Sequence, residues 1–328
     1  MPFAVTGQAL GPPESYAIVA HDPGPCKPHD VRIAIQAAGV SFVDVLTARG
    51  DYQVKPPLPF IPGSECAGVI TAVGSDVSPD RIGERVMASN WGGMFADAIT
   101  LPAARVHRLP DALSLTEGAV FGVAFATAWH ALVQRGALQP GETLLVLGAG
   151  GATGHAAVQI GKHLGARVIA SASSAAKRDA ALAAGADAAV AAGAPDWRDA
   201  VKAANAGKPI DVVFDPISGD ATELAFRTLG WRGRHLVIGF AGGPIARLPA
   251  NLALLKGAAL IGVDIRQFGI FEPELAAANI QHLLALAGDG VLRPAIGATY
   301  PMAQFAAAMA DAANGARAGR IVLTMDSD

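Results

Sequence analysis

The sequence has 328 residues, of which 52% are hydrophobic and only 16% are charged, and its formal net charge is −3. A chain of this length and composition can bury a large core, which excludes general disorder and favours two domains over one. Because no run of Lys and Arg occurs, we expect a small-molecule partner rather than nucleic acid or an anionic membrane.

The sequence also restricts the expected location of the protein and the roles of its cysteines. The first ten residues lack the basic cluster and apolar run of a secretory signal, and no apolar stretch is long and uncharged enough for a membrane span. We therefore expect a cytoplasmic protein. The two cysteines, Cys26 and Cys66, are too few for a disulfide framework or a four-thiolate metal site and are interpreted as packing residues.

The first third of the chain is predicted to be rich in β-strands. Short apolar runs, such as residues 31–35 and 67–73, are separated by clusters of Pro and Gly at residues 23–28 and 56–63. Strands interrupted so often by turn residues are typical of a compact β-barrel.

From residue 143 onward the pattern changes to apolar strands that alternate with Ala-rich helical stretches. The strands show little alternation of polar and apolar residues, as expected for a parallel sheet covered by helices on both faces. The predicted strands are Thr143–Leu147, 167–170, 188–190, 210–214, 235–238 and 258–263. A helix at 272–287 and a final strand at 321–323 follow, and we expect the C-terminal tail to return to the first domain.

A glycine-rich turn between the first of these strands and the next helix predicts a dinucleotide site. The tight turn needs residues without bulky side chains, and the amides and dipole at the helix start favour a pyrophosphate. Gly151 and Gly154 occupy the second and third glycine positions of the usual fingerprint, whereas Ala149 replaces the first. The residues expected to contact the cofactor here are Ala149, Gly150, Gly151, Ala152, Thr153 and Gly154.

The cofactor is predicted to be NADPH rather than NADH. An NAD site normally has an acidic residue after the second strand, but no Asp or Glu occurs between Gly154 and Asp179. Hydroxyl and cationic side chains, which suit a 2′-phosphate, follow that strand instead. They are Ser173, Ser174, Lys177 and Arg178. Alternatively, the two cations only begin a solvated helix, and Arg317 or Arg320 would then be the next candidates for the phosphate.

With these residues located, the chain resembles the quinone oxidoreductases of the medium-chain dehydrogenase/reductase superfamily. The loop at 144–154 followed by Val158 and Gln159 is similar to their nucleotide loop, and residues 59–69 and 83–86 to their barrel signature. The resemblance spans roughly residues 30–325. It implies an α/β fold with a GroES-like β-barrel catalytic domain, residues 1–120 and 266–328, and a Rossmann doubly wound parallel sheet domain, residues 121–265.

The same resemblance implies further cofactor contacts, a subunit arrangement and whether the protein binds a catalytic metal. It adds Thr127, Gly239 and Phe240 to the expected cofactor contacts and implies a homodimer paired through the strand at 258–263. Related alcohol dehydrogenases bind a catalytic zinc, but the matching positions here are Ser41, Ser64 and Val123. These residues are poor zinc ligands, so we expect a zinc-independent enzyme.

The candidate catalytic residues are Ser41, Asp44, Tyr52 and Arg266. Ser41 stands where the family has Asn, and Asp44 either takes part in the site or caps a helix beginning near Val45. Tyr52 matches a tyrosine that lines the family's substrate cleft. It either stacks on a ring or donates a hydrogen bond there, or it is an ordinary loop aromatic. Arg266 either contacts an anionic substrate or quinone oxygen or pairs with Asp264 or Glu272.

Three functions are compatible with these residues. The first is NADPH-dependent reduction of quinones, in which the protein mainly orients the two rings. The second is reduction of α,β-unsaturated carbonyls or enoyl thioesters on the same scaffold. The third is a non-catalytic NADPH-binding redox sensor, which would show no turnover with any acceptor.

Overall fold

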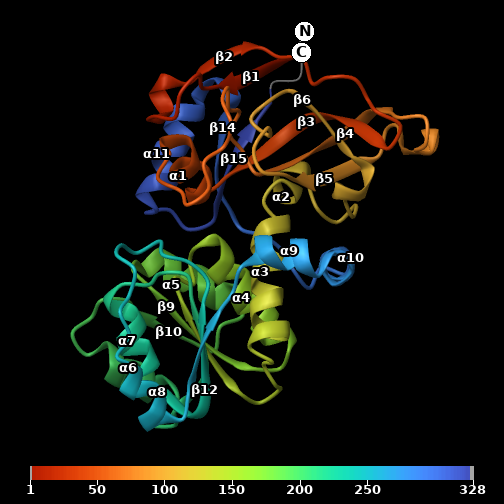
Figure 1. Ribbon diagram of the computed structural model, residues 1–328. Helices are drawn as coiled ribbons and strands as arrows, with labels where there is room; N and C mark the ends of the chain where they lie inside the picture. The colour runs from red at the N-terminus through yellow and green to blue at the C-terminus, as the bar shows by residue number, and fades with distance from the viewer. Residues whose placement is uncertain (1, 326–328) are drawn as a thin grey trace. The chain divides into compact units, whose positions relative to one another are not determined.

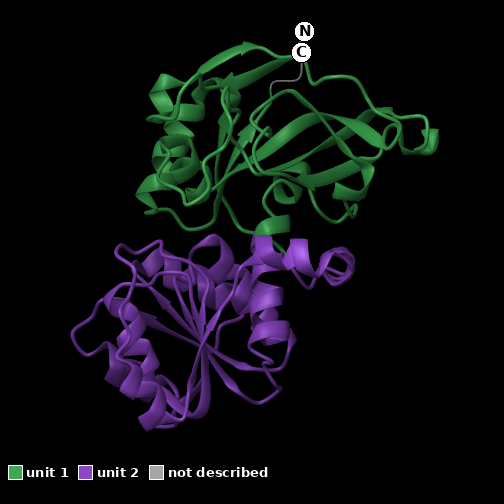
Figure 2. Cartoon of the chain, in the orientation of Figure 1, with its two compact units in different colours: residues 1–123, 293–328 green, residues 124–292 purple. Residues whose placement is uncertain are grey.

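The computed structural model describes residues 2–325, and the chain divides into two compact units (Figure 2). Unit 1 is drawn from Met1–Val123 and Arg293–Asp328, and unit 2 is Ala124–Leu292. Within the described residues, no helix is long and apolar enough to cross a membrane.

Unit 2 contains a six-stranded parallel sheet in the order β10-β9-β8-β11-β12-β13. Strands β9, β10 and β12 of this sheet are labelled in Figure 1. From β8 the chain builds outward through β9 and β10, then returns to the other side of β8 for β11, β12 and β13. This is the doubly wound order, and its direction reverses between β8 and β11. The strands are β8 (Thr143–Leu147), β9 (Arg167–Ala172), β10 (Ala188–Ala191), β11 (Ile210–Asp215), β12 (Leu229–Val237) and β13 (Ala259–Gly262).

Helices cover both faces of this sheet because successive residues of each buried strand point to opposite sides. Leu145 and Val213 face a core completed by side chains of α6, α7 and α8, whereas Leu144 and Val168 face Gly161 of α4. The helices of unit 2 are α4 (Ala152–His163), α5 (Ala175–Ala183), α6 (Trp197–Ala204), α7 (Asp220–Phe226), α8 (Ala250–Lys256), α9 (Ile265–Phe271) and α10 (Pro273–Gly288). Helix α3 (Gly122–Trp129) leads into unit 2 and continues as a π-helix, His130–Arg135.

The predicted second boundary, at residue 265, differs from the observed one. Residues 266–292 form α9 and α10 and belong to unit 2. Phe268 of α9 stacks on His130 with ring centroids 3.9 Å apart, and Asn279 of α10 hydrogen-bonds to Gln134. These contacts join both helices to the π-helix of unit 2. Helical periodicity alone does not show which unit a helix packs against.

Unit 1 is built on a mainly antiparallel sheet in the order β14-β15-β3-β4-β5-β7, with β6 also paired to β3. The strands of this sheet are β3 (Asp30–Val40), β4 (Glu65–Val73), β5 (Arg85–Ser89), β6 (Ala98–Pro102), β7 (Val106–Arg108), β14 (Ile296–Pro301) and β15 (Arg320–Thr324). Strands β1 (Phe3–Thr6) and β2 (Ala17–Ala20) pair with each other in a separate two-stranded sheet. Because β15 pairs with the first long strand, β3, the C-terminal segment completes the mainly antiparallel sheet, as the sequence predicted.

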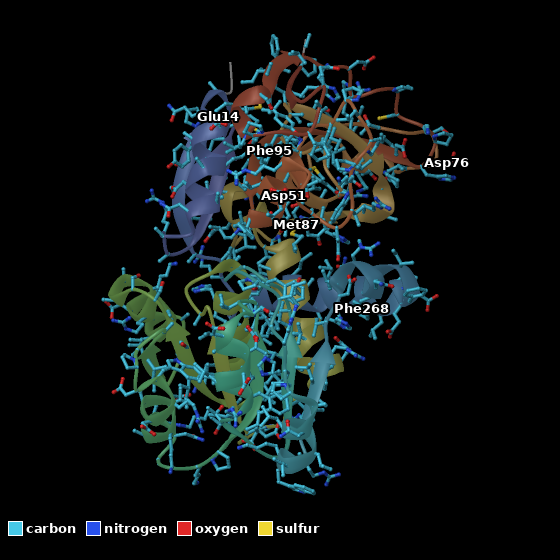
Figure 3. All side chains as sticks on the ribbon, turned by 60° about the vertical axis from the view of Figure 1, so that its left-hand side comes forward. Glu14, Asp51, Asp76, Met87, Phe95 and Phe268 are labelled. Atoms are coloured by element: carbon cyan, nitrogen blue, oxygen red, sulfur yellow. The ribbon has the colours of Figure 1, made fainter. Side chains whose placement is uncertain are left out.

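The core of unit 1 lies between this sheet and a small number of helices. Helix α1 (Phe42–Arg49) lies beside α11 (Phe305–Asn314) in Figure 1, and both contribute to the core with β3 and β15. Phe95, labelled in Figure 3, is fully buried there. The short helix α2 (Leu115–Gly118) packs on β3 and β4.

Candidate functional site

The glycine-rich turn of unit 2 has three distinct steric roles. Gly148 has a positive φ of 61°, a conformation that glycine adopts without strain. At Gly154 an added Cβ would lie 2.3 Å from the Gly148 carbonyl oxygen, so only glycine lets α4 pack this closely on the turn. At Gly151, by contrast, an added Cβ would approach only that same oxygen, at 3.3 Å, and the residue is exposed.

This arrangement fits a bound pyrophosphate. Helix α4 begins after Gly151 with no side-chain cap and no acidic residue in its first turn. An anion placed beside Gly151 would meet the open side of the turn and the positive end of the helix dipole. The neighbouring residues of the predicted set, Ala149, Gly150, Ala152 and Thr153, form the rest of the turn and the helix start.

The predicted phosphate-binding side chains lie next to this turn. An added Cβ at Gly150 would lie 2.6 Å from both Cβ and Cγ of Lys177, so the Lys177 stem passes directly over the turn. Ser174 caps α5 by accepting a hydrogen bond from the Lys177 backbone amide, and Ser173 is exposed beside it. Arg178 donates from Nη1 to the Ala172 and Ser173 carbonyl oxygens, at 3.2 and 3.4 Å. Lys177 is therefore better placed than Arg178 to reach a ligand at the turn.

A buried carboxylate organises the loop that follows β11. Asp215 Oδ1 accepts from the backbone amides of Ile217 and Ser218, both at 2.9 Å. Its Oδ2 accepts from Thr222 Oγ1 at 2.6 Å and lies 2.9 Å from His235 Nε2. Burial disfavours the charged carboxylate, but the hydrogen bonds from His235 and Thr222 outweigh it and hold the pKa of Asp215 below its ordinary value.

The loop held by Asp215 contacts the glycine turn and the loop after β12. An added Cβ at Gly148 would lie 2.7 Å from Ile217 Cδ1. Ala241 donates its amide to the Pro216 carbonyl oxygen at 3.1 Å, which keeps Gly239 and the half-exposed Phe240 close to this loop. The turn after β8, the Asp215 loop and the loop after β12 thus meet where the strand order reverses, the usual ligand position in such sheets.

The other predicted residues of unit 2 have less direct positions. Thr127 is buried on α3. Arg266 is the second residue of α9, and the side chain of the N-cap residue Asp264 accepts from the Arg266 amide. The Arg266 guanidinium lies 3.9 Å from the Asp264 carboxylate. Arg266 thus lies near one of the two acids that the sequence offered as partners, and its contact with a substrate stays a prediction.

In unit 1, Ser41 and Asp44 form a helix cap. Ser41 is the N-cap of α1, its Oγ accepts from the Asp44 amide at 3.1 Å, and Asp44 Oδ2 accepts from the Ser41 amide at 2.8 Å and from Ser41 Oγ at 2.6 Å. The helix begins at Phe42, three residues before the predicted start near Val45, because this capping box includes Ser41.

Asp44 also lines a small hollow within unit 1. This hollow is partly open to solvent and encloses room for about one water molecule. Its lining residues are Val43, Asp44, Thr47, Phe60, Ser64, Trp91 and Gly92. Burial raises the pKa of the Asp44 carboxyl from 3.8 to about 6, although hydrogen bonds from Ser41 and Ser64 and the Arg320 charge favour ionisation. Asp44 is thus both a structural cap and a titratable group at this small hollow.

Aromatic side chains line the same region. Tyr52 packs against Trp91 with ring centroids 5.4 Å apart and planes tilted by 45°. Trp91 and Phe60 were not among the predicted site residues. The available signal was the loop Asn90-Trp91-Gly92-Gly93, where an aromatic residue precedes two glycines between strands.

Arg320, the alternative phosphate ligand, lies inside unit 1. Its Nη2 donates to Glu65 Oε1 at 2.9 Å, and Glu65 Oε2 accepts from the Val123 amide at 2.7 Å. Arg320 and Glu65 are both buried, so this guanidinium is committed to a buried ion pair. Arg317, the other alternative, pairs with Asp311 at 2.8 Å.

The three positions that the sequence resemblance matched to zinc ligands of alcohol dehydrogenases belong to this network of unit 1. Ser41 and Ser64 hydrogen-bond to Asp44, and Val123 offers only its backbone amide, to Glu65. Within residues 2–325, no group of three or more His, Cys, Asp or Glu side chains is placed to hold a metal ion.

Comparison with known proteins connects both sites to one superfamily. The family model described as alcohol dehydrogenase GroES-like domain matches residues 27–111, and the one described as zinc-binding dehydrogenase matches residues 152–279. Quinone oxidoreductase-like protein 2 of Rattus norvegicus is 36% identical over 310 residues, which cover 92% of this chain and 87% of the relative.

Solved structures agree over nearly the whole chain. A probable oxidoreductase from Mycobacterium abscessus is 34% identical, with a TM-score of 0.87 and coverage of 98% of this chain and 99% of that one. A mycobacterial protein solved in complex with NADPH is 25% identical, with a TM-score of 0.89 and coverage of 99% and 100%. The chain therefore belongs to the medium-chain dehydrogenase/reductase superfamily, with a GroES-like domain, a Rossmann-type domain and quinone oxidoreductase-like proteins among its relatives.

Proposed function

We propose that this protein is an NADPH-dependent oxidoreductase that reduces quinones by hydride transfer without a metal ion. The observation that carries the proposal is the position of the Lys177 stem against Gly150 of the glycine-rich turn. In addition, no acidic residue occurs at the end of the next strand, β9. That combination favours a 2′-phosphate over the bare ribose of NADH. The NADPH complex of the mycobacterial structure and the name of the rat relative support the same assignment.

The cofactor would be held mainly by backbone atoms of unit 2. The open side of Gly151 and the first turn of α4 would receive the pyrophosphate, and Ser173, Ser174 and Lys177 would surround the 2′-phosphate. When bound, NADPH supplies a hydride. The Asp215 loop keeps Ile217 against the glycine turn, which fixes one wall of the nucleotide site before binding.

The residues of unit 1 would bind and protonate the acceptor. Asp44 is the candidate proton source, because a carboxyl with a pKa of about 6 remains partly protonated near neutral pH. Ser41 Oγ, which donates to Asp44 Oδ2, orients this carboxyl. For a quinone, one hydride and one proton give the hydroquinone, so the hydride of NADPH and one proton from Asp44 balance the reaction, and Asp44 regains its proton from solvent.

Zinc independence rests on the residues at the ligand positions. Hydroxyls of Ser41 and Ser64 are weak zinc ligands and Val123 has no ligating side-chain atom, so a Lewis acid would lack its usual anchors. A quinone needs less help than a simple alcohol, because the charge that arrives with the hydride is delocalised within the substrate.

A homodimer is a further part of the proposal. Strand β13 is the edge of the unit 2 sheet, and Leu260 on it is 49% exposed. An apolar, unpaired strand edge is suited to pairing with a second copy. Light scattering after size exclusion should give the mass of two chains, and Leu260→Arg should shift it to one.

The decisive experiment is an NADPH-oxidation screen against quinones, α,β-unsaturated ketones and enoyl thioesters in parallel, with NADH as the alternative donor. The proposal expects the highest kcat/KM with quinones and NADPH. A preference for enones or thioesters would replace the substrate class, and NADPH binding without turnover of any acceptor would indicate a redox sensor.

A further inference from the structure

The hollow of unit 1 has an aromatic wall that neither the fold nor the proposed reaction requires. Trp91 is 40% exposed although its indole is among the largest apolar side chains, and it lines the hollow together with the buried Phe60. Tyr52 packs against the Trp91 ring at 5.4 Å between centroids. An exposed indole beside a hollow, supported by a second ring, is typical of a binding surface for another flat group.

The backbone around Trp91 is fixed on both sides. The Asn90 amide donates to the Ser64 carbonyl oxygen at 3.0 Å, and the Gly93 amide donates to the Ile61 carbonyl oxygen at 2.7 Å. The Asn90 side chain closes the loop by donating to the Gly92 carbonyl oxygen at 3.1 Å. These bonds attach the Trp91 loop to the segment that carries Ser64 and Phe60.

Glycine is required for this loop to lie where it does. Gly92 and Gly93 have φ values of 92° and 93°, which other residues rarely adopt. An added Cβ at Gly92 would lie 2.6 Å from Phe60 Cε2 and 2.9 Å from the Ile61 carbonyl oxygen. The close approach of the loop to Phe60 therefore positions the Trp91 backbone before any ligand arrives, which lowers the entropy cost of binding.

Polar side chains also line the same hollow. Asp44 and Ser64 provide a carboxyl and a hydroxyl among the lining residues, and Thr47 provides another hydroxyl. The enclosed space has room for about one water molecule, so a larger ligand would lie over its open side, against the exposed face of Trp91. An exposed aromatic ring beside a carboxyl and hydroxyl groups suits a small, flat, conjugated molecule with a carbonyl oxygen.

We propose that Trp91 is a specificity-determining residue that selects planar aromatic acceptors over aliphatic ones by stacking on their ring. This inference rests on the proposed function, because it assigns the substrate class to the hollow that holds Asp44. It predicts that the preference for quinones over small enones depends on the ring of residue 91 and not on the nucleotide site.

The test compares two acceptors, 1,4-naphthoquinone and but-3-en-2-one, with NADPH as donor. In Trp91→Ala, we expect kcat/KM for the naphthoquinone to fall roughly three- to tenfold, while that for the aliphatic enone changes less than about twofold. Trp91→Phe keeps a ring and should restore most of the naphthoquinone value. Trp231→Ala, which removes an indole that is 78% exposed on unit 2, is the matched control and should leave both values unchanged.

A binding measurement separates failure of this inference from failure of the proposed reaction. Naphthoquinone titrated without NADPH should quench indole fluorescence in the parent and in Trp231→Phe, and the saturable part of this quenching should be lost in Trp91→Phe. If neither acceptor is reduced by the parent protein, the proposed reaction fails and this titration still decides the role of Trp91. Equal quenching in the parent and in Trp91→Phe, or an equal loss of kcat/KM for both acceptors in Trp91→Ala, would overturn the inference.

Discussion

The two candidate sites use different parts of the polypeptide. In unit 2, the candidate nucleotide site is formed mainly by backbone. Its critical residues are glycines, which differ in the atoms that an added Cβ would meet. In unit 1, the hollow is formed by side chains from segments far apart in sequence, such as Asp44, Ser64 and Trp91. A backbone site tolerates almost no added atoms at its closest contact, whereas a side-chain site can be altered in graded steps. The predictions below test that contrast.

The largest effect is expected from adding one methyl group at Gly154. Gly154→Ala places Cβ against the Gly148 carbonyl oxygen, at 2.3 Å in the present backbone, whereas Gly151→Ala adds the same atom with only one neighbour, at 3.3 Å. Because the obstacle is backbone rather than a flexible side chain, we expect Gly154→Ala to lower the free energy of unfolding by about 3 kcal/mol. Gly151→Ala should change it by less than about 1 kcal/mol. Urea unfolding of both variants measures this, and equal effects would show that the turn can relax.

The next effect concerns the stability of unit 1 as a function of pH. The pKa of Asp44 is raised by burial to about 6, so the folded protein binds this proton more tightly than the unfolded chain does. The resulting stabilisation is fully present below about pH 3.8 and is lost as pH rises through about 6. Relative to Asp44→Asn, the parent should lose up to about 3 kcal/mol between pH 4 and 7, at 1.36 kcal/mol per pKa unit.

Paired denaturant titrations of the parent and Asp44→Asn at several pH values provide the measurement. The difference between the two proteins cancels most other titrating groups. A difference that stays constant from pH 4 to 7 would mean that Asp44 ionises at its ordinary pKa and is unsuited to deliver a proton near neutral pH.

Gly151→Val should remove cofactor binding while leaving a folded protein. The branched side chain would fill the open side of the turn where the pyrophosphate is expected, and we predict at least a roughly hundredfold loss of NADPH affinity. Gly269→Val is the matched control, since an added Cβ there meets nothing within 4 Å and lies on α9. Retained NADPH binding in a fluorescence titration of Gly151→Val would place the pyrophosphate elsewhere.

Replacing the two cations after β9 should have a smaller, selective effect. The double variant Lys177→Ala with Arg178→Ala should weaken NADPH by about tenfold to a hundredfold, because a charge-assisted hydrogen bond contributes roughly 1.5 to 3 kcal/mol. NADH should bind almost as before, since it lacks the 2′-phosphate. Replacing two exposed lysines of the same unit, Lys202 and Lys208, controls for a general change in charge.

Both variants should be measured at one moderate salt concentration, because an exposed phosphate contact is screened. Since Arg178 also donates to the Ala172 and Ser173 carbonyl oxygens, the thermal stability of the double variant must be measured beside its affinity. An unchanged preference for NADPH over NADH would exclude this pair as the phosphate site.

No effect is expected from removing metal ions. Because Ser41, Ser64 and Val123 occupy the ligand positions, prolonged treatment with a strong chelator should leave NADPH oxidation unchanged, and elemental analysis should find no stoichiometric zinc. One tightly bound zinc per chain, together with inactivation on chelation, would contradict the proposed metal-free reaction.

The sequence was sufficient for most of unit 2 because its signals are local. The predicted strand Thr143–Leu147 is confirmed as β8, and the turn and helix that follow it appear in the expected order. Buried parallel strands are continuous apolar runs, and a glycine turn between such a strand and a helix is readable without knowing any distant contact.

What could not be predicted depends on contacts between distant residues. The pairing of Arg320 with Glu65 joins residues 255 positions apart, so the sequence left Arg320 as a possible phosphate ligand. Trp91 was missed because the direction of a loop side chain is set by tertiary contacts, here those of Gly92 with Phe60. The helix pattern of α9 and α10 was recognisable, but their membership of unit 2 follows from partners such as His130 and Gln134.

The hydrogen bonds to both carboxylate oxygens of Asp215 have a consequence for the rate of cofactor binding. Each of its oxygens already has two partners, and these hold the loop at Ile217 and Ser218 in a single arrangement. Because these bonds do not involve a ligand, we expect the loop to be ordered before a dinucleotide arrives, so that association need not wait for it to close. Nucleotide capture at this wall should approach the rate of a diffusional encounter with a rigid surface, and differences in affinity among loop variants should arise mainly from how fast the cofactor leaves.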